Sequence, residues 1–162
     1  HQPSPPLAAP VPLPAVRRPP PGIVGPFGRL TSAQLLGVAD LAAAAGAPEI
    51  RLSPWRALYV DAPLVGAAAL GLVVTDDDPI LRIDACPGAP DCRSSTVDTR
   101  RAARLLADRG FDGTVHLSGC AKGCARSAPA DLVLVGMDGR YGVVRNGTPH
   151  DPILHTIAPG EL

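Results

Sequence analysis

The feature that most constrains this chain is the spacing of its cysteines. All four lie in two short stretches, residues 86–92 and 120–124. Five residues separate the first pair, three separate the second, and 27 lie between the pairs. Each short stretch can bring two sulfurs to one centre, and the longer connection allows the two pairs to converge. The spacing therefore predicts that four thiolates share one metal centre.

Three kinds of site compete for these thiols. Structural zinc sites usually use cysteines two residues apart, and neither pair here has that spacing. Disulfides need an oxidising compartment, and residues 1–22 lack the continuous apolar segment of a signal peptide. A cubane iron–sulfur cluster would use all four thiolates, although the C-x2-C runs of ferredoxins are also absent. The residues alone leave zinc, disulfides and a cluster open.

Composition limits the classes of partner that this chain is expected to bind. Lys plus Arg and Asp plus Glu number 15 each, so charge indicates neither nucleic acid nor an anionic membrane. Aromatic residues make up 3% of the chain, so few side chains are available on which the bases of single-stranded nucleic acid could stack. No apolar run reaches the roughly 18 residues of a membrane span, so we expect a cytoplasmic protein. Since the chain begins with His1 rather than Met, we expect a fragment or a processed product.

Three segments are expected along the chain. Residues 1–22 hold nine of the 20 prolines. Proline fixes φ and removes N–H donors, so we interpret this segment as an extended linker rather than a proline-rich recognition ligand. Residues 23–75 are predicted as a small α/β unit, and residues 76–162 as the unit that carries the cysteines.

The first unit is expected to alternate strands and helices. A short strand is predicted at 27–30. Thr31 and Gln34 have the spacing of a capping box, and the helix that they open should end near Gly46. Strands at 49–53 and 56–60 should follow, and then a second helix at 61–71.

In the second unit, a strand at 81–85 should deliver Cys86, and a strand at 114–117 should deliver Cys120. Ser95 begins a capping signature for the helix between them. Asp138-Gly139 predicts a hairpin between strands at 132–137 and 141–145, and residues 146–162 are expected to be loop. Each cysteine pair would then follow the end of a strand, which is a rigid platform for a site.

The cysteine loops have the pattern of a known family. Cys86-Pro87-Gly88 opens the first, and the second reads Gly119-Cys120-Ala121-Lys122-Gly123-Cys124. This C-x5-C…C-x3-C arrangement resembles the sirohaem and iron–sulfur nitrite/sulfite reductase superfamily. The stretches 51–56 (RLSPWR), 84–90 (DACPGAP) and 118–124 (SGCAKGC) resemble its precorrin-3B synthase branch more closely. The resemblance runs from about Gly22 to at least Asn146 and covers the C-terminal half of such an enzyme.

The resemblance implies an α+β fold: a ferredoxin-like half domain followed by an α/β cluster-binding unit. It implies a [4Fe–4S] cluster on Cys86, Cys92, Cys120 and Cys124, with Cys124 as the bridging position if sirohaem is bound. It further implies an oxygen-dependent monooxygenase of cobalamin synthesis that hydroxylates precorrin-3A and closes a lactone to give precorrin-3B. The implied partners are a tetrapyrrole, an electron donor and the N-terminal half of the enzyme or a second copy of this chain.

Two alternatives remain. One is a fragment of a sirohaem-dependent sulfite or nitrite reductase, although Ala121-Lys122 stands where reductases commonly have Pro-Asn. The other is a non-catalytic four-cysteine module in which a metal only braces the fold.

Basic residues near the cysteines are the candidates for binding a polycarboxylate substrate. The substrate-binding candidates are Arg51, Arg56, Arg93, Lys122 and Arg126, with Arg100 and Arg101 close to the first loop. A mononuclear non-haem iron would need two histidines and a carboxylate, for which His116, His150 and His155 are the candidates. No residue is assigned a catalytic role.

Overall fold

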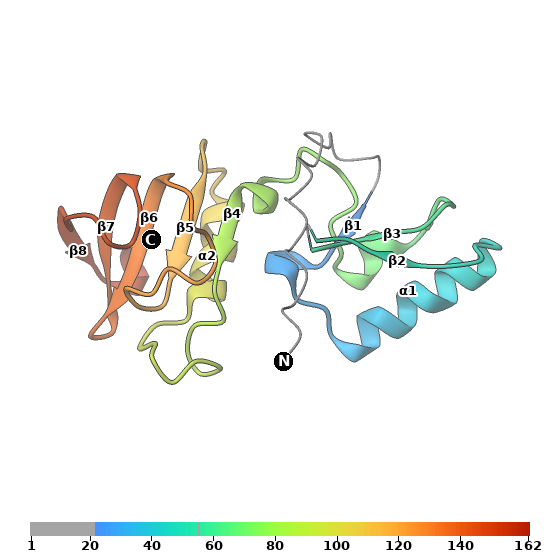
Figure 1. The fold of residues 1–162 in the computed structure, drawn as a ribbon, viewed down its shortest axis with the longest axis horizontal. Coiled ribbons are helices and arrows are strands. Elements are labelled where there is room, and N and C mark those ends of the chain that lie inside the picture. Colours follow the sequence, from blue (N-terminus) through green and yellow to red (C-terminus); the bar gives the residue numbers. More distant parts are fainter. Residues whose placement is uncertain (1–21, 55) are drawn as a thin grey trace, which may run out of the picture.

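Two sheets of different kinds divide the chain into two lobes (Figure 1). The computed structural model describes residues 22–54 and 56–162, so residues 1–21 of the predicted linker and Trp55 lie outside the described residues. The first lobe, residues 22–74, holds a three-stranded antiparallel sheet, and the second lobe, residues 83–162, holds a five-stranded mixed sheet. Residues 75–82 join them. This is the α+β class that the sequence predicts.

The first lobe is built on helix α1, Ser32–Ala44. The predicted capping box is confirmed: Gln34 N donates to Thr31 Oγ1 at 3.1 Å, and Thr31 N donates to Gln34 Oε1 at 2.9 Å. The helix buries Val38 completely against a cluster that includes Ile23, Leu58 and Leu72.

The sheet of the first lobe has the order β1-β3-β2. Its strands are β1 (Ile23–Val24), β2 (Arg51–Leu52) and β3 (Ala57–Tyr59). On its other side β1 forms an antiparallel bridge to Val73. Strand β2 is therefore an edge of this sheet.

Two predictions for the first lobe are wrong. Residues 27–30 do not form a strand: Pro26–Gly28 form a 3₁₀ turn, η1, in which Phe27 has φ 58°. Residues 61–71 contain only a 3₁₀ helix, η2 (Ala67–Leu70). Gly66 and Gly71 flank η2 with φ of 98° and 73°, and this left-handed backbone cannot continue a helix on either side.

The second lobe has the strand order β4-β5-β6-β7-β8. A 3₁₀ helix, η3 (Pro79–Arg82), leads into it. Strands β4, β5 and β6 are parallel, whereas β6–β7 and β7–β8 are antiparallel. The strands are β4 (Ile83–Ala85), β5 (Val115–Ser118), β6 (Ala130–Met137), β7 (Arg140–Gly147) and β8 (His155–Ile157).

Helix α2, Thr99–Asp108, connects β4 to β5 and covers one face of this sheet. Its buried Ala102, Ala103 and Leu106 pack against the fully buried Val115 and Leu117. Burying a valine or leucine side chain contributes about 1.5–3 kcal/mol, so this layer is the main core of the lobe.

Two further predictions are corrected in the second lobe. The N-cap of α2 is Asp98, whose carboxylate accepts from Arg101 N at 3.0 Å, and the helix does not begin at Ser95. The tail is not all loop, because His155–Ile157 pair with β7 as β8, and Pro159–Glu161 form a 3₁₀ helix, η4. The predicted hairpin around Asp138-Gly139 is confirmed as the turn between β6 and β7.

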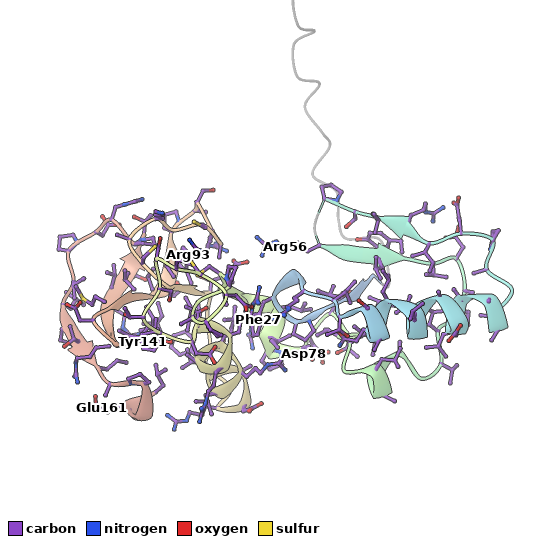
Figure 2. All side chains as sticks on the ribbon, turned by 90° about the horizontal axis from the view of Figure 1, so that it is seen from below. Phe27, Arg56, Asp78, Arg93, Tyr141 and Glu161 are labelled. Atoms are coloured by element: carbon purple, nitrogen blue, oxygen red, sulfur yellow. The ribbon has the colours of Figure 1, made fainter. Side chains whose placement is uncertain are left out.

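The lobes meet through side chains at their junction. Phe27 packs against the core of the second lobe, and the Arg104 guanidinium lies 5.8 Å from its ring centroid. Arg29 pairs with Asp91 at 3.2 Å. Figure 2 shows Phe27 and Arg56 in this region. Among the described residues, none of the helices has the length and apolarity that a bilayer crossing requires.

Candidate metal centre

The two cysteine loops emerge side by side from the sheet of the second lobe. Cys86 directly follows β4, and Cys120 follows β5 after one glycine. The two strands are parallel neighbours with Ala85 opposite Leu117, so their carboxyl ends lie at the same edge. Cys86 N donates to Leu117 O at 3.2 Å, which extends the ladder into the first loop. The prediction that each pair follows a strand end is confirmed.

The first loop is held by its own backbone and by α2. Cys92 N donates to Gly88 O at 2.7 Å, and Ala89 N donates to Val97 O at 2.8 Å. Thr99 Oγ1, in the first turn of α2, donates to Cys86 O at 2.7 Å. Gly88 has φ 66°, and a Cβ there would lie 2.4 Å from Thr99 Oγ1, so only glycine fits.

The two loops touch. Gly119 N donates to Cys86 Sγ at 3.1 Å, which places a backbone donor of the second loop on a sulfur of the first. A Cβ on Gly119 would lie 2.4 Å from Ser95 Oγ. Lys122 Nζ donates to Ser94 Oγ at 3.3 Å. The two cysteine loops are therefore in contact, and the sharing of one metal centre by four thiolates stays a prediction.

The four thiols differ in exposure. Cys86 is buried, Cys92 and Cys120 are half-buried, and Cys124 is exposed, and all four are free thiols. Within residues 22–54 and 56–162, no three His, Cys, Asp or Glu side chains are grouped closely enough to hold one metal ion. The expected group of histidines and a carboxylate for mononuclear iron is not formed by the described residues either.

A carboxylate fixes two of the predicted basic residues. Asp84, on β4, accepts from Arg126 Nη1 at 3.0 Å and lies 3.7 Å from Arg56 Nη1. Arg56 also donates to Ala125 O at 3.2 Å, just after the last cysteine. Arg56 comes from the first lobe, so this cluster joins that lobe to the second cysteine loop.

The other substrate-binding candidates lie in different settings. Arg93 lies in the first loop (Figure 2), and Lys122 lies in the second. Arg51 is placed on edge strand β2, where it pairs with Asp61 at 2.6 Å and Glu49 at 3.2 Å within its own lobe. The Asp61 hydrogen bond raises the pKa of Arg51. Arg51 is thus engaged within its own lobe, whereas Arg93 and Lys122 lie in the segments that carry the cysteines, and Arg56 and Arg126 pair with Asp84.

Sequence reasoning missed a basic groove at the lobe junction. The groove has a volume of about 630 Å³ and opens between η1, the first cysteine loop and the start of α2. Its cations are Arg29, Arg100, Arg101 and Arg104, and Asp91 accepts from Arg29 and from Arg100. Arg29 and Arg104 are far apart in sequence, and only the tertiary fold places them together.

His116 is one of the buried polar residues near the cysteine loops. It lies on β5 opposite Asp84 of β4, is fully buried, and neither ring nitrogen has a hydrogen-bond partner among the described residues. Burial lowers the pKa of His116, with opposing effects of Asp84 and Arg126, so the imidazole is neutral at pH 7. His150 and His155 are exposed in the tail.

Parts of this chain are similar in sequence to known proteins. Residues 16–61 match the model of the nitrite/sulfite reductase ferredoxin-like half domain. A precorrin-3B synthase from a Sinorhizobium species is 38% identical over 134 residues, which cover 75% of this chain and 29% of that protein. A sulfite reductase [ferredoxin] of Mycolicibacterium paratuberculosis is 34% identical over 152 residues, which cover 80% and 27%.

The chain is a homologue of the nitrite and sulfite reductases. This agrees with the resemblance seen in the cysteine motifs. The solved structure of the Mycobacterium tuberculosis NirA protein matches 87% of this chain and 32% of that one, with a TM-score of 0.69 at 27% identity. A dissimilatory sulfite reductase structure, at 13% identity and a TM-score of 0.51, shares the fold. The chain spans less than a third of the length of these relatives.

Proposed function

We propose that this chain is the cluster-bearing part of an oxidoreductase that acts on a tetrapyrrole, and that its four cysteines hold one [4Fe–4S] cluster. The observation that carries the proposal is the pair of parallel strands that delivers both cysteine loops to one edge, with Gly119 N–H on Cys86 Sγ. Hydrogen bonds from backbone amides to cysteine sulfur are typical of cluster sites and help to set the reduction potential.

The arrangement of the donors favours a cluster over zinc. A cubane spreads its four thiolate ligands over separate iron corners, so the sulfurs need not meet at one point. The sequence also supports a cluster over zinc, since neither cysteine pair has the two-residue separation that structural zinc sites usually use. When bound, the cluster would supply one-electron transfer, and Cys124 would be the bridging ligand if sirohaem is also present.

For the reaction, we propose that the parent enzyme hydroxylates precorrin-3A with dioxygen and closes the lactone of precorrin-3B. The support is the 38% identity to a precorrin-3B synthase and the Ala121-Lys122 pair in the second loop. Arg93 and Lys122 would attract the acetate and propionate arms of the macrocycle, because carboxylates bind best to fixed cations. Asp84 would hold Arg56 and Arg126 in place beside them.

A sirohaem-dependent sulfite or nitrite reductase is the second candidate. The likeness to NirA over 87% of the chain favours it. Anaerobic purification followed by iron, acid-labile sulfide and tetrapyrrole analysis separates the candidates. We expect iron and sulfide from a cluster without tightly bound sirohaem. Strong sirohaem absorbance would favour the reductase, whereas stoichiometric zinc without sulfide would leave only the non-catalytic module.

Cys124→Ser tests the ligand set with little effect on the apo fold, because its thiol is exposed. We expect this variant to lose most of its sulfide after reconstitution while its apo form unfolds at the same urea concentration as the parent. Full retention of sulfide would remove Cys124 from the ligands.

Turnover should need the rest of the enzyme. A large ligand bound in part of a cleft leaves much of its surface in water and loses preorganised contacts. We expect the purified chain to turn over precorrin-3A poorly alone and better with a supplied N-terminal half and a reductant. In that assembly Lys122→Gln should lower kcat/KM while iron and sulfide stay at parental levels. Unchanged kinetics would exclude a substrate role for Lys122.

A further inference from the structure

His116 occupies an unusual position beneath the second cysteine loop. Side chains alternate along β5, so Val115 and Leu117 face the core under α2, and His116 faces the opposite side of the sheet. It is completely buried there. Within the described part of the chain, neither Nδ1 nor Nε2 has a hydrogen-bond partner. A buried polar group without a partner is destabilising, so this imidazole needs an explanation.

The polar edge of the ring faces the cysteine loop. A Cβ placed on Gly123, between Cys120 and Cys124, would lie 3.8 Å from His116 Cε1. Cε1 is the ring carbon bonded to both nitrogens, so the edge that carries them is the edge nearest to the loop. Gly123 takes φ 65°, a left-handed backbone conformation that favours glycine, so the turn brings the loop backbone over the ring.

The neighbouring charged side chains do not form hydrogen bonds with the imidazole ring of His116. Asp84 is opposite His116 in the parallel register, but one of its oxygens accepts from Arg126 and the other lies 3.7 Å from Arg56 Nη1. A neutral imidazole still has one N–H donor and one acceptor nitrogen. A hydrogen-bond partner for the imidazole can therefore come from the Cys120–Cys124 loop or from a group bound to that loop.

We infer that His116 is a positioning residue for the cluster: its imidazole N–H donates a hydrogen bond to the Cys120–Cys124 loop, or to sulfur held by it, when the cluster is bound. The inference rests on the proposed cluster. Metal sites commonly use such outer hydrogen bonds to orient their ligands, and their loss weakens metal binding. Such a bond would give the buried ring the partner that it lacks among the described residues.

The test uses opposite effects in the apo and loaded chains. His116→Leu removes both polar atoms and keeps a similar volume, whereas His116→Gln keeps an N–H donor. Replacing an unsatisfied buried polar group by an apolar one is neutral or stabilising, so the apo form of His116→Leu should unfold at the same or a higher urea concentration than the parent. The reconstituted His116→Leu protein should release iron to a chelator about tenfold faster and have a more negative reduction potential. His116→Gln should restore much of both, and the exposed His155→Leu should match the parent.

Each outcome of this test either supports the inference or overturns it. Failure of apo His116→Leu to fold, or equal destabilisation of its apo and loaded forms, would assign the imidazole a purely structural role and overturn the inference. Parental iron release and potential in His116→Leu would overturn it as well. If the parent chain takes up no iron and sulfide at all, the proposed cluster fails, and that result is visible before any variant is made.

Discussion

Asp84 contacts more charged and polar residues than a partly exposed carboxylate usually does. It accepts from Arg126 in the second lobe and faces Arg56 of the first, and it lies beside His116 in the sheet. Its side chain is 32% exposed, so water screens these ion pairs in part. One residue thus links the lobes, the second cysteine loop and the buried imidazole.

Asp84→Asn should therefore destabilise the chain by about 1–2 kcal/mol, because two arginines lose their carboxylate while hydrogen bonding is only partly replaced. Urea unfolding of the apo chain measures this. Asp112→Asn is the matched control, since Asp112 is fully exposed and its one ion pair within residues 22–54 and 56–162 is with Arg82, and it should change stability by less than about 0.5 kcal/mol. Equal effects of the two substitutions would show that the Asp84 cluster contributes little.

His116 should also make stability depend on pH. Burial lowers its pKa from 6.5, so the unfolded chain binds a proton more readily than the folded chain. Stability is then fully present above pH 6.5 and decreases as the pH falls through that value toward the folded pKa, by up to about 1.4 kcal/mol per pH unit. Urea titrations of the apo chain at pH 7.0, 6.0 and 5.0 should show this decrease, and His116→Leu should remove most of it. The same slope in the variant would place its origin elsewhere.

At the scale of elements, β6 limits the position of the second cysteine loop. A Cβ on Gly136 would lie 2.5 Å from Gly119 O and 2.4 Å from Val97 Cγ2. Both neighbours belong to segments that hold the cysteines. The segments that carry the cysteines therefore pack directly against β6.

Gly136→Ala should push the Gly119 backbone away from Cys86 and loosen the cluster. We expect at least a twofold lower sulfide content after reconstitution and a loss of about 1–3 kcal/mol in the stability of the apo chain, the usual cost of overpacking. Gly160→Ala serves as the control, because a Cβ there meets nothing within 4 Å. Parental sulfide content and stability in Gly136→Ala would mean that the loops can move without cost.

Local signals predicted local structure well. The capping box at Thr31, the hairpin at Asp138-Gly139 and the strand ends before both cysteine pairs depend on neighbouring residues, and all are confirmed. The strand predicted at 27–30 failed because Phe27 turns toward Arg104 of the other lobe. Strand β8 was missed because its pairing with the edge of β7 is a tertiary contact.

The site was predictable only in part, for the same reason. Cysteine spacing predicted the two converging loops. Nothing in the sequence indicated that Asp84 would engage both Arg56 and Arg126, or that His116 would lie unpaired under Gly123. These relations depend on the register between β4 and β5 and on the placement of the two lobes. Long-range geometry of this kind leaves no local pattern.

At the scale of the whole molecule, the first lobe ends in a strand that has one strand neighbour among the described residues. Strand β2 ends the β1-β3-β2 order, and Leu52 on it is 83% exposed. On α1, Leu35 and Leu36 are also exposed. An edge strand with an exposed apolar side chain can pair with a strand of another chain. Because the chain spans less than a third of its relatives, we propose that this edge receives a further part of the enzyme or a second copy of the chain.

We therefore predict that the purified chain self-associates at micromolar concentrations, and that Leu52→Lys reduces this association at least tenfold. A charge on an edge strand opposes strand pairing because the incoming strand would have to desolvate it. Val65→Lys is the matched control, since Val65 is 85% exposed but lies outside the strands of the sheet, and it should leave association unchanged. Sedimentation velocity over a concentration series measures both variants. A parent chain that stays monomeric throughout, or equal effects of the two lysines, would rule out β2 as the docking edge. A supplied N-terminal half that binds the parent chain but not Leu52→Lys would place that half on β2.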